Sequence, residues 1–276
     1  MMSRSFRFRL GCVALFAFAV TLASGHAHGQ SLWLPRDRDR SLLVEALHPR
    51  LETIDEDFFT AAFFLDARWS LSPKVFLVGE LPYARFRGDF YYYTISPGRS
   101  ESTSGNLYLG IEVRGSESPI FGEFGVRLPT TEEREYGASL VGRRADLARA
   151  AFVENAVPIT VAFNLREVSA GIVSRLRLGT TILIPTEGRL DTELLGLYSL
   201  QMGYEGRAAR LGVALSGRVL VTSEYGNLGE RSTNQMELHA DFGPWRFRPG
   251  VELKLPLDSA ASPVPVVLGV SLSAGL

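Results

Sequence analysis

The sequence predicts an all-β fold, an antiparallel up-and-down transmembrane β-barrel of about twelve strands, with ten as the fallback. Three observations support it. Apolar and polar residues alternate in one segment after another, several of these segments run to roughly 10 residues or more, and short turns alternate with longer polar loops. Soluble strands most often have about 5 or 6 residues, whereas a tilted strand needs roughly 9 to 11 to cross a bilayer.

The chain begins with a segment typical of an export signal. Basic residues at its start precede the uncharged apolar run 10–23, and the small-residue pattern 27–29 follows it. The run is shorter than the roughly 20 residues that a membrane-spanning helix needs. We therefore predict a cleaved signal peptide over residues 1–29 and one outer-membrane barrel domain over residues 30–276.

Composition excludes several kinds of chemistry. A net charge of -1 over 276 residues gives no electrostatic bias toward nucleic acid. The single cysteine, Cys12, lies in the predicted signal peptide, so the mature chain has no disulfide, thiolate ligand or thiol nucleophile. The sequence also lacks metal-ligand spacing and a phosphate-binding glycine loop. We expect no cofactor, no metal and no nucleic-acid partner.

Alternation with a period of two residues identifies the strands. In the last segment the apolar Leu268, Val270 and Leu272 share one face, which suits lipid. The small polar Ser271 and Ser273 share the other face, which suits a lumen. The pattern is clear in residues 63–71, 107–114, 172–184, 210–219, 236–242, 245–255 and 266–276.

The first strand and the connections set the strand count. The segment Ser41–Pro49 alternates poorly, and as a strand it would place His48 and Pro49 at its outer end. Outer-membrane barrels put short turns in the periplasm and long loops outside, which gives about twelve strands and both termini in the periplasm. The short turns are 72–74, 116–119, 205–207 and 243–244, and the longer loops include 88–104 and 222–233.

The longest gap between predicted strands is Thr130–Val157. Within it, the run Arg143–Arg149 has the composition of a short helix in an external loop. A solvated, mobile loop is the alternative, and it is the interpretation we favour.

Aromatic residues gather near the predicted membrane boundaries. Tyr83, Phe86 and Trp245 fit the aromatic girdles of a barrel. Tyr91, Tyr92 and Tyr93 run past the end of their strand, so they are candidates for ligand binding by an external loop as much as for a girdle.

Charged residues on the polar face would point into the lumen. Opposite charges are interleaved there, which favours a ladder of ion pairs filling a narrow barrel over an arginine-rich path for anionic or polar solutes. His239 is expected to be a member of this polar network. The lumen-lining candidates are Arg114, Glu112, Arg175, Arg177, Arg210, Arg218, Glu237, His239, Arg246, Arg248, Glu252 and Lys254, with Glu80, Glu123, Arg127, Arg166 and Asp241 expected beside them.

One hairpin carries a resemblance to a known family. Residues 105–114 read Gly-Asn-Leu-Tyr-Leu-Gly-Ile-Glu-Val-Arg, and residues 124–130 read Phe-Gly-Val-Arg-Leu-Pro-Thr. This pair resembles the outer-membrane proteins named for a phenol-degradation meta-pathway, although Asn106 replaces that family's aspartate and Thr131 its glycine. The resemblance implies a transporter-like barrel for small organic compounds, without defined catalytic residues.

The carboxyl terminus resembles the assembly signal of outer-membrane barrels, with Leu276 where phenylalanine or tryptophan is commoner. It implies the barrel-assembly machinery as a partner during insertion, and outer-membrane lipid as the surroundings afterwards.

Three functions follow as hypotheses. The first is passive or substrate-selective passage of small organic molecules, and the second is a structural or adhesive barrel with ligand-binding loops. An outer-membrane lipid hydrolase is the third, but neither His48 nor His239 has the His-x-Ser spacing of the phospholipase type. We expect no enzymatic activity.

Overall fold

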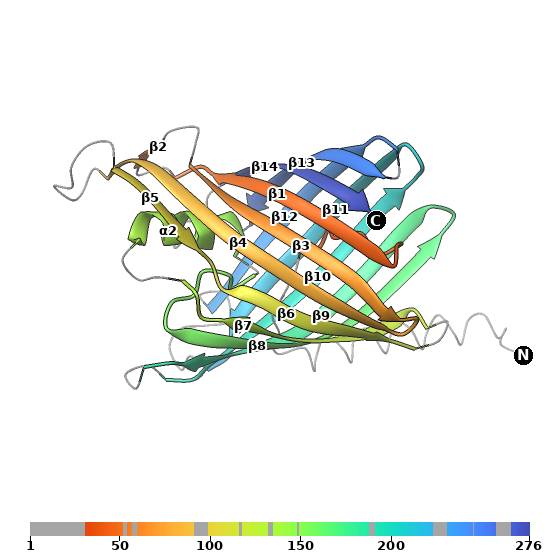
Figure 1. The fold of residues 1–276 in the computed structure, drawn as a ribbon, viewed down its shortest axis with the longest axis horizontal. Helices are drawn as coiled ribbons and strands as arrows, with labels where there is room; N and C mark the ends of the chain where they lie inside the picture. Colours follow the sequence, from red (N-terminus) through yellow and green to blue (C-terminus); the bar gives the residue numbers. More distant parts are fainter. Residues whose placement is uncertain are drawn as a thin grey trace, which may run out of the picture.

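The computed structural model is a closed β-barrel that holds a helix inside one of its ends (Figure 1). The predicted signal peptide, Cys12, Tyr91 to Tyr93 and Trp245 lie outside the residues it describes. The described residues are 31–51, 54–56, 60–90, 99–115, 118–131, 135–147, 149–187, 191–222, 231–244, 246–257 and 266–276.

All strand pairings among the described residues are antiparallel, and most join strands that follow one another along the chain. The strands are β1 Arg40–Pro49, β2 Ile54–Glu56, β3 Ala61–Ser72, β4 Val75–Phe90, β5 Arg99–Ser104, β6 Leu107–Arg114, β7 Ile120–Leu128, β8 Ala156–Ser169, β9 Ile172–Pro185, β10 Glu193–Glu205, β11 Ala209–Leu220, β12 Ser232–Phe242, β13 Phe247–Pro256 and β14 Val267–Gly275. The helix α2 spans Tyr136–Ala145.

The wall contains twelve strand positions, as the alternation predicts. β5 and β6 both pair with β4 and follow one another along it, so together they fill one position. The short β2 pairs only with the end of β4 and is an extra strand. β1 pairs with β14 from Ser41↔Gly275 to Pro49↔Val267, which closes the barrel and makes the poorly alternating first segment a full wall strand.

The two faces of the wall differ as a membrane barrel requires. Leu268 and Val270 are 59% and 60% exposed on the outside, whereas Ser271 and Ser273 on the same strand are 8% and 4% exposed. The aromatic ring of Tyr83 lies outside, 6.2 Å from that of Phe63. The lipid-facing surface is therefore apolar, and the lumen contains most of the charge.

The two ends of the barrel also differ. At the turn end, β3 and β4 are joined through Pro73 and Lys74 alone, and both Arg40 and Leu276 lie there, joined by a backbone hydrogen bond of 3.1 Å. The loop end has the longer connections. The connection expected over 88–104 is shorter than predicted, because β4 continues to Phe90 and β5 begins at Arg99.

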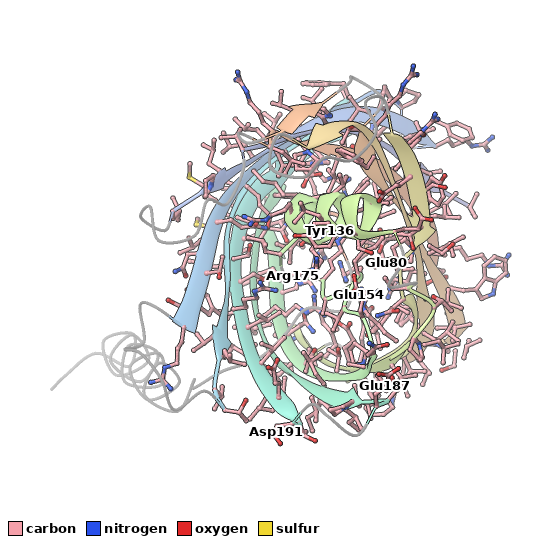
Figure 2. All side chains as sticks on the ribbon, turned by 90° about the vertical axis from the view of Figure 1, so that its left-hand side faces the viewer. Glu80, Tyr136, Glu154, Arg175, Glu187 and Asp191 are labelled. Atoms are coloured by element: carbon pink, nitrogen blue, oxygen red, sulfur yellow. The ribbon has the colours of Figure 1, made fainter. Side chains whose placement is uncertain are left out.

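Two segments that are not wall strands occupy the lumen. Residues 31–39 enter from the turn end, and α2 with the chain after it lies inside the loop end, where Figure 2 shows the helix encircled by the wall. Within the described ranges, no helix is long and apolar enough to cross a membrane.

Candidate functional site in the occupied lumen

Residues 31–39, here called the turn-end plug, are held by apolar packing and by charged wall residues. Leu32, Trp33 and Leu34 are buried together with Leu43 and Ala214 of the wall. The interior of the barrel therefore holds an apolar core at the turn end, formed around a segment that precedes the first strand.

Two wall residues accommodate the indole of Trp33. The His239 ring stacks on it with centroids 4.6 Å apart and planes at 11°. A Cβ at Gly212 would lie 2.6 Å from the indole, so only glycine leaves room for Trp33 there. His239 also lies 3.3 Å from Asp241 Oδ2, which places it in the polar network predicted for it.

Polar contacts fix both ends of the turn-end plug. Arg36 Nε donates to Glu112 Oε1 at 3.0 Å, and Arg68 Nε donates to Glu112 Oε2 at 2.8 Å. At the deeper end, Ser31 Oγ donates to Glu45 Oε1 at 2.8 Å. Glu112 and Glu45 belong to wall strands, so the plug is bound to the wall through charge-assisted hydrogen bonds.

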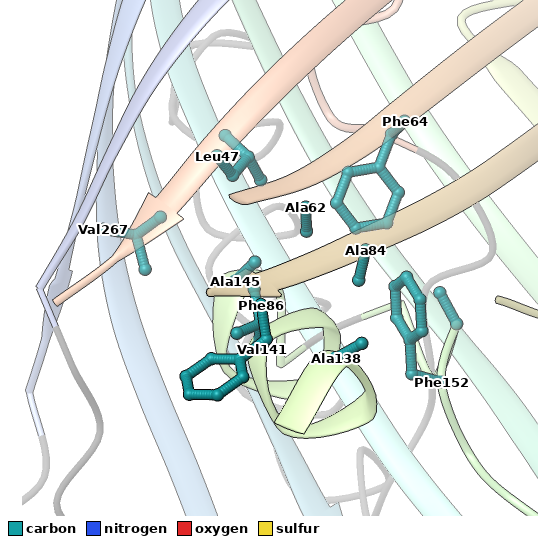
Figure 3. Close-up of a cluster of buried hydrophobic side chains, with 11 residues drawn as sticks. Leu47, Ala62, Phe64, Ala84, Phe86, Ala138, Val141, Ala145, Phe152 and Val267 are labelled. Carbon is teal, nitrogen blue, oxygen red and sulfur yellow. The ribbon is translucent and has the colours of Figure 1, made fainter. Parts of the chain in front are cut away.

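Residues 135–147 and 149–155, here called the loop-end plug, fill the opposite half. Figure 3 shows Ala138, Val141 and Ala145 of α2 packed against β1, β3 and β4. Phe86 is fully buried under the helix, so its expected place in an aromatic girdle is wrong, because alternation along β4 turns it inward. The helix is amphipathic, and its apolar side faces the wall.

A glycine in α2 permits a close approach. A Cβ at Gly142 would lie 2.4 Å from the ring of Phe152, which is itself held edge-on against Phe64 with centroids 6.1 Å apart. Any larger residue at position 142 would push the helix away from the chain that follows it.

A wall carboxylate caps the helix. Glu101 Oε2 of β5 accepts hydrogen bonds from the backbone amides of Gly137 at 2.7 Å and Ala138 at 3.3 Å. These amides belong to the first turn, where a helix leaves donors without partners and carries partial positive charge. The cap therefore anchors the helix to the barrel wall.

Arg149 fixes the end of the loop-end plug in the centre of the barrel. Its guanidinium is 2% exposed and pairs with Glu45, with Asp66 at 3.4 Å and with Glu80 at 3.3 Å. Its Nε lies 2.9 Å from Asp146. The interpretation of this stretch as a solvated, mobile loop is therefore wrong, because the carboxylates of three wall strands hold its arginine inside the lumen.

The surroundings of Arg149 keep it charged. Burial alone would lower its pKa, but the carboxylates of Glu45, Asp146, Asp66 and Glu80 together raise the pKa well above its ordinary value. The positive charge is therefore permanent, and it offsets the repulsion among the wall carboxylates.

The two plugs meet at Glu45. Oε1 of this residue accepts from Ser31 of the turn-end plug, and Oε2 pairs with Arg149 of the loop-end plug. Glu45 is fully buried at the middle of β1. Asp66 of β3 also contacts both plugs, since its Oδ1 accepts from the Ser31 amide at 3.4 Å and its Oδ2 lies 3.4 Å from Arg149. Two wall carboxylates therefore bind both segments.

Many of the remaining charges of the lumen form ion pairs, whereas Arg175 donates to Asn164 Oδ1 at 3.1 Å and to the Leu32 carbonyl at 3.4 Å. Lys254 Nζ lies 2.6 Å from Asp146 and 3.2 Å from Glu252, which links β13 to the loop-end plug. Further pairs are Arg127–Glu80 at 2.7 Å, Arg177–Glu123 at 2.8 Å, Arg166–Glu205 at 2.7 Å and Arg210–Asp241. The expected interleaving of opposite charges is present, and Figure 2 shows Glu80 and Arg175 projecting into the interior.

Most of the predicted lining residues lie inside the barrel. Arg246 is the exception: it is exposed in the turn between β12 and β13, because regular alternation begins only at Phe247. Arg114 and Arg218 are half-buried. The buried ones are Glu112, Arg175, Arg177, Arg210, Glu237, His239, Arg248, Glu252 and Lys254.

A cavity of about 370 Å³ remains between the loop-end plug and the wall. Leu140, Leu147 and Phe152 supply apolar surface. Arg143 and Arg144 of α2 and Arg218 of β11 supply positive charge. Arg218 Nη1 also donates to the Leu147 carbonyl at 2.9 Å, which connects β11 to the plug.

Sequence reasoning missed three of the central residues, Trp33, Glu45 and Arg149. The apolar stretch at 32–34, between the predicted leader and the first strand, is a signal that a short segment seeks burial. Arg149 ends the run that we weighed as a helix. Glu45 interrupts an apolar strand, and a carboxylate in such a place predicts a buried partner, because an unpaired buried charge is costly.

No group of three or more histidine, cysteine or acidic side chains placed to hold a metal ion occurs in the part of the chain that the structure describes. No protein-family model matches the sequence, and no curated protein matches it.

Solved structures do match the fold. An outer-membrane channel from Pseudomonas putida F1 superposes with a TM-score of 0.61 at 13% identity, covering 90% of this chain and 99% of that one. LpxR from Salmonella typhimurium matches with a TM-score of 0.49 at 10% identity, covering 86% of this chain and 100% of that one. At these identities the likeness concerns the fold, and the chain has the fold of an outer-membrane β-barrel.

Proposed function

We propose that the protein is an outer-membrane channel for small organic molecules whose lumen is closed at rest by the two plugs. The proposal rests on the observation that the lumen is filled by two segments that are not wall strands. Side chains of the wall just fill a barrel of about eight strands, but this twelve-strand barrel is filled by residues 31–39 and by the loop-end plug. Displacing them would leave a wide, polar path.

The contacts that hold the plugs are of a reversible kind. The turn-end plug is bound through Arg36, Trp33 and Ser31, and the loop-end plug through Arg149 and the Glu101 cap. Charged groups released from such contacts can be solvated by water entering the lumen. The fold shared with an outer-membrane channel and the resemblance of the 105–130 hairpin support the same function.

Conductance measurements test the proposal. Purified full-length protein and a variant that lacks residues 31–39 and carries Arg149→Met, so that neither plug is held, would be reconstituted in planar bilayers and in liposomes, after heat-modifiable gel mobility has shown that both are folded. We expect brief or rare openings from the full-length protein, and sustained conductance with faster uptake of small solutes from the deletion variant. A folded deletion variant that remains closed would reject the proposal.

A structural barrel is the second candidate, and the density of buried ion pairs favours it. A role limited to scaffolding or adhesion predicts that no displacement of a plug changes permeability. A lipid hydrolase has less support, because His239 lies inside the barrel, stacked on Trp33 and beside Asp241. We therefore propose a non-catalytic role, which an esterase assay of the wild type and a His239→Ala variant would test.

A further inference from the structure

The cavity beside the loop-end plug has the size and lining of a ligand site. Its volume of about 370 Å³ lies within the range of roughly 300 to 1,000 Å³ that small-molecule sites occupy. It is bounded by α2 and the chain after it on one side and by Arg218 and Thr233 of the wall on the other.

The described lining of this cavity is rich in positive charge. It contains three arginines, Arg143, Arg144 and Arg218, and one acidic residue, Asp146. The Asp146 carboxylate already has two cationic partners, Lys254 Nζ at 2.6 Å and Arg149 Nε at 2.9 Å. The described lining therefore presents more arginine donors than carboxylate acceptors, which favours an anionic ligand over a cationic one.

Arg143 and Arg144 have a second role that explains their sequence position. They lie in the last turn of α2, where positive charge stabilises the helix C-terminus. Two adjacent arginines repel one another, however, and an anion in the cavity would relieve that repulsion. Leu140, one turn earlier, and Phe152 provide the apolar surface that would contact the rest of the ligand.

We propose that this cavity binds a small carboxylate with an apolar body, with Arg143 and Arg144 holding the carboxylate. The inference rests on the proposed channel function and names the solute class that would reach the loop-end plug first. Lodged between α2 and β11, such a ligand contacts the plug and the wall at once.

Ligand binding to the full-length protein in detergent micelles tests the site. Three probes share one ring and differ in charge: benzoate, benzamide and benzylamine. We expect benzoate to bind at least about tenfold more tightly than the other two, because benzamide lacks the negative charge that pairs with arginine and benzylamine carries a positive one. Equal binding of all three probes would overturn the site.

Variants locate the binding. The double change Arg143→Gln with Arg144→Gln is expected to weaken benzoate binding by about tenfold or more, while leaving benzamide binding unchanged. Arg246→Gln is the matched control, since it removes an exposed arginine in a turn at the opposite end. Loss of benzoate binding in the control, or none in the double variant, would contradict the assignment.

The same proteins separate this site from the channel function. Binding of benzoate to the arginine pair without any uptake into liposomes would leave the site standing and remove the proposed passage. Uptake with no binding at the pair would leave passage standing and remove the site.

Discussion

Replacing Arg149 by methionine is expected to release the loop-end plug. Methionine has a similar length and fills much of the same space, but it leaves Glu45, Asp66 and Glu80 without the cation that they share. Removing one partner of a buried ion pair costs about 3–5 kcal/mol, because a charge remains buried and uncompensated. When the plug is displaced, water enters the lumen and solvates the carboxylates. The cost of about 3–5 kcal/mol therefore destabilises only the state in which the plug is bound.

The size of the effect follows from this difference. A tenfold change in an equilibrium constant corresponds to about 1.4 kcal/mol, so 3–5 kcal/mol multiplies the ratio of displaced to seated plug by roughly a hundredfold to a few thousandfold. Single-channel recording in planar bilayers would measure it as a rise in open probability, with each variant made in the protein lacking residues 31–39 so that the turn-end plug does not mask the change.

A matched control is Arg166→Met. Its pair with Glu205 is partly exposed, at 16% and 20% of the two side chains, and exposed pairs contribute only about 0–1 kcal/mol. The reasoning would be refuted if the Arg149 variant folded normally, as judged by gel mobility, and its conductance matched that of the protein lacking residues 31–39 and that of the control.

Further predictions concern the packing and protonation of the two plugs. Gly212→Leu is expected to displace the indole of Trp33 from its stacking on His239, which would change tryptophan fluorescence; an unchanged spectrum would argue against the assigned packing. Glu101→Ala removes the cap of α2 at a cost of about 0.5–2 kcal/mol, measurable as faster hydrogen exchange at the amides of Gly137 and Ala138. Gly142→Val forces the helix away from the following chain and should increase protease cleavage within the loop-end plug of the folded barrel. The raised pKa of Arg149 means that its stabilisation is fully present below the ordinary arginine pKa and is lost only above the raised value, so a shift from about pH 7 to about pH 10 should not unseat the plug; alkaline opening that disappears in the Arg149→Met variant would contradict this.

The wall of the barrel was predictable because lipid and lumen impose opposite demands on successive residues. The alternation in residues 266–276 corresponds to the lipid and lumen faces of β14. Even the first strand is present, because its pairing with β14 and β3 supplies backbone hydrogen bonds that do not depend on perfect alternation. Arg246 was misplaced because the alternation of apolar and polar residues runs from β13 back into the turn before it, where side chains no longer alternate between lumen and lipid.

The contents of the lumen were harder to predict, and the reason is physical. A polar segment inside a charged barrel has the same composition as one in water, so the run that ends at Arg149 reads equally well as a solvated loop. What distinguishes the two is the presence of partners on distant strands, and Glu45, Asp66 and Glu80 belong to three of them. Phe86 was misread for a related reason, since a girdle residue and a residue beneath a plug are both aromatic.

The shared contacts of Glu45 make the two mouths of the barrel thermodynamically linked. Release of Ser31 removes a hydrogen-bond donor from Glu45, and release of Arg149 removes its cation, so each departure changes the free energy with which Glu45 holds the other segment. By thermodynamic linkage, the release of either plug changes the free energy that holds the other plug by the same amount. Under the proposed channel function, a solute that displaces one plug would change the free energy that holds the other, and Glu45 of β1 and Asp66 of β3 are the wall carboxylates that contact both.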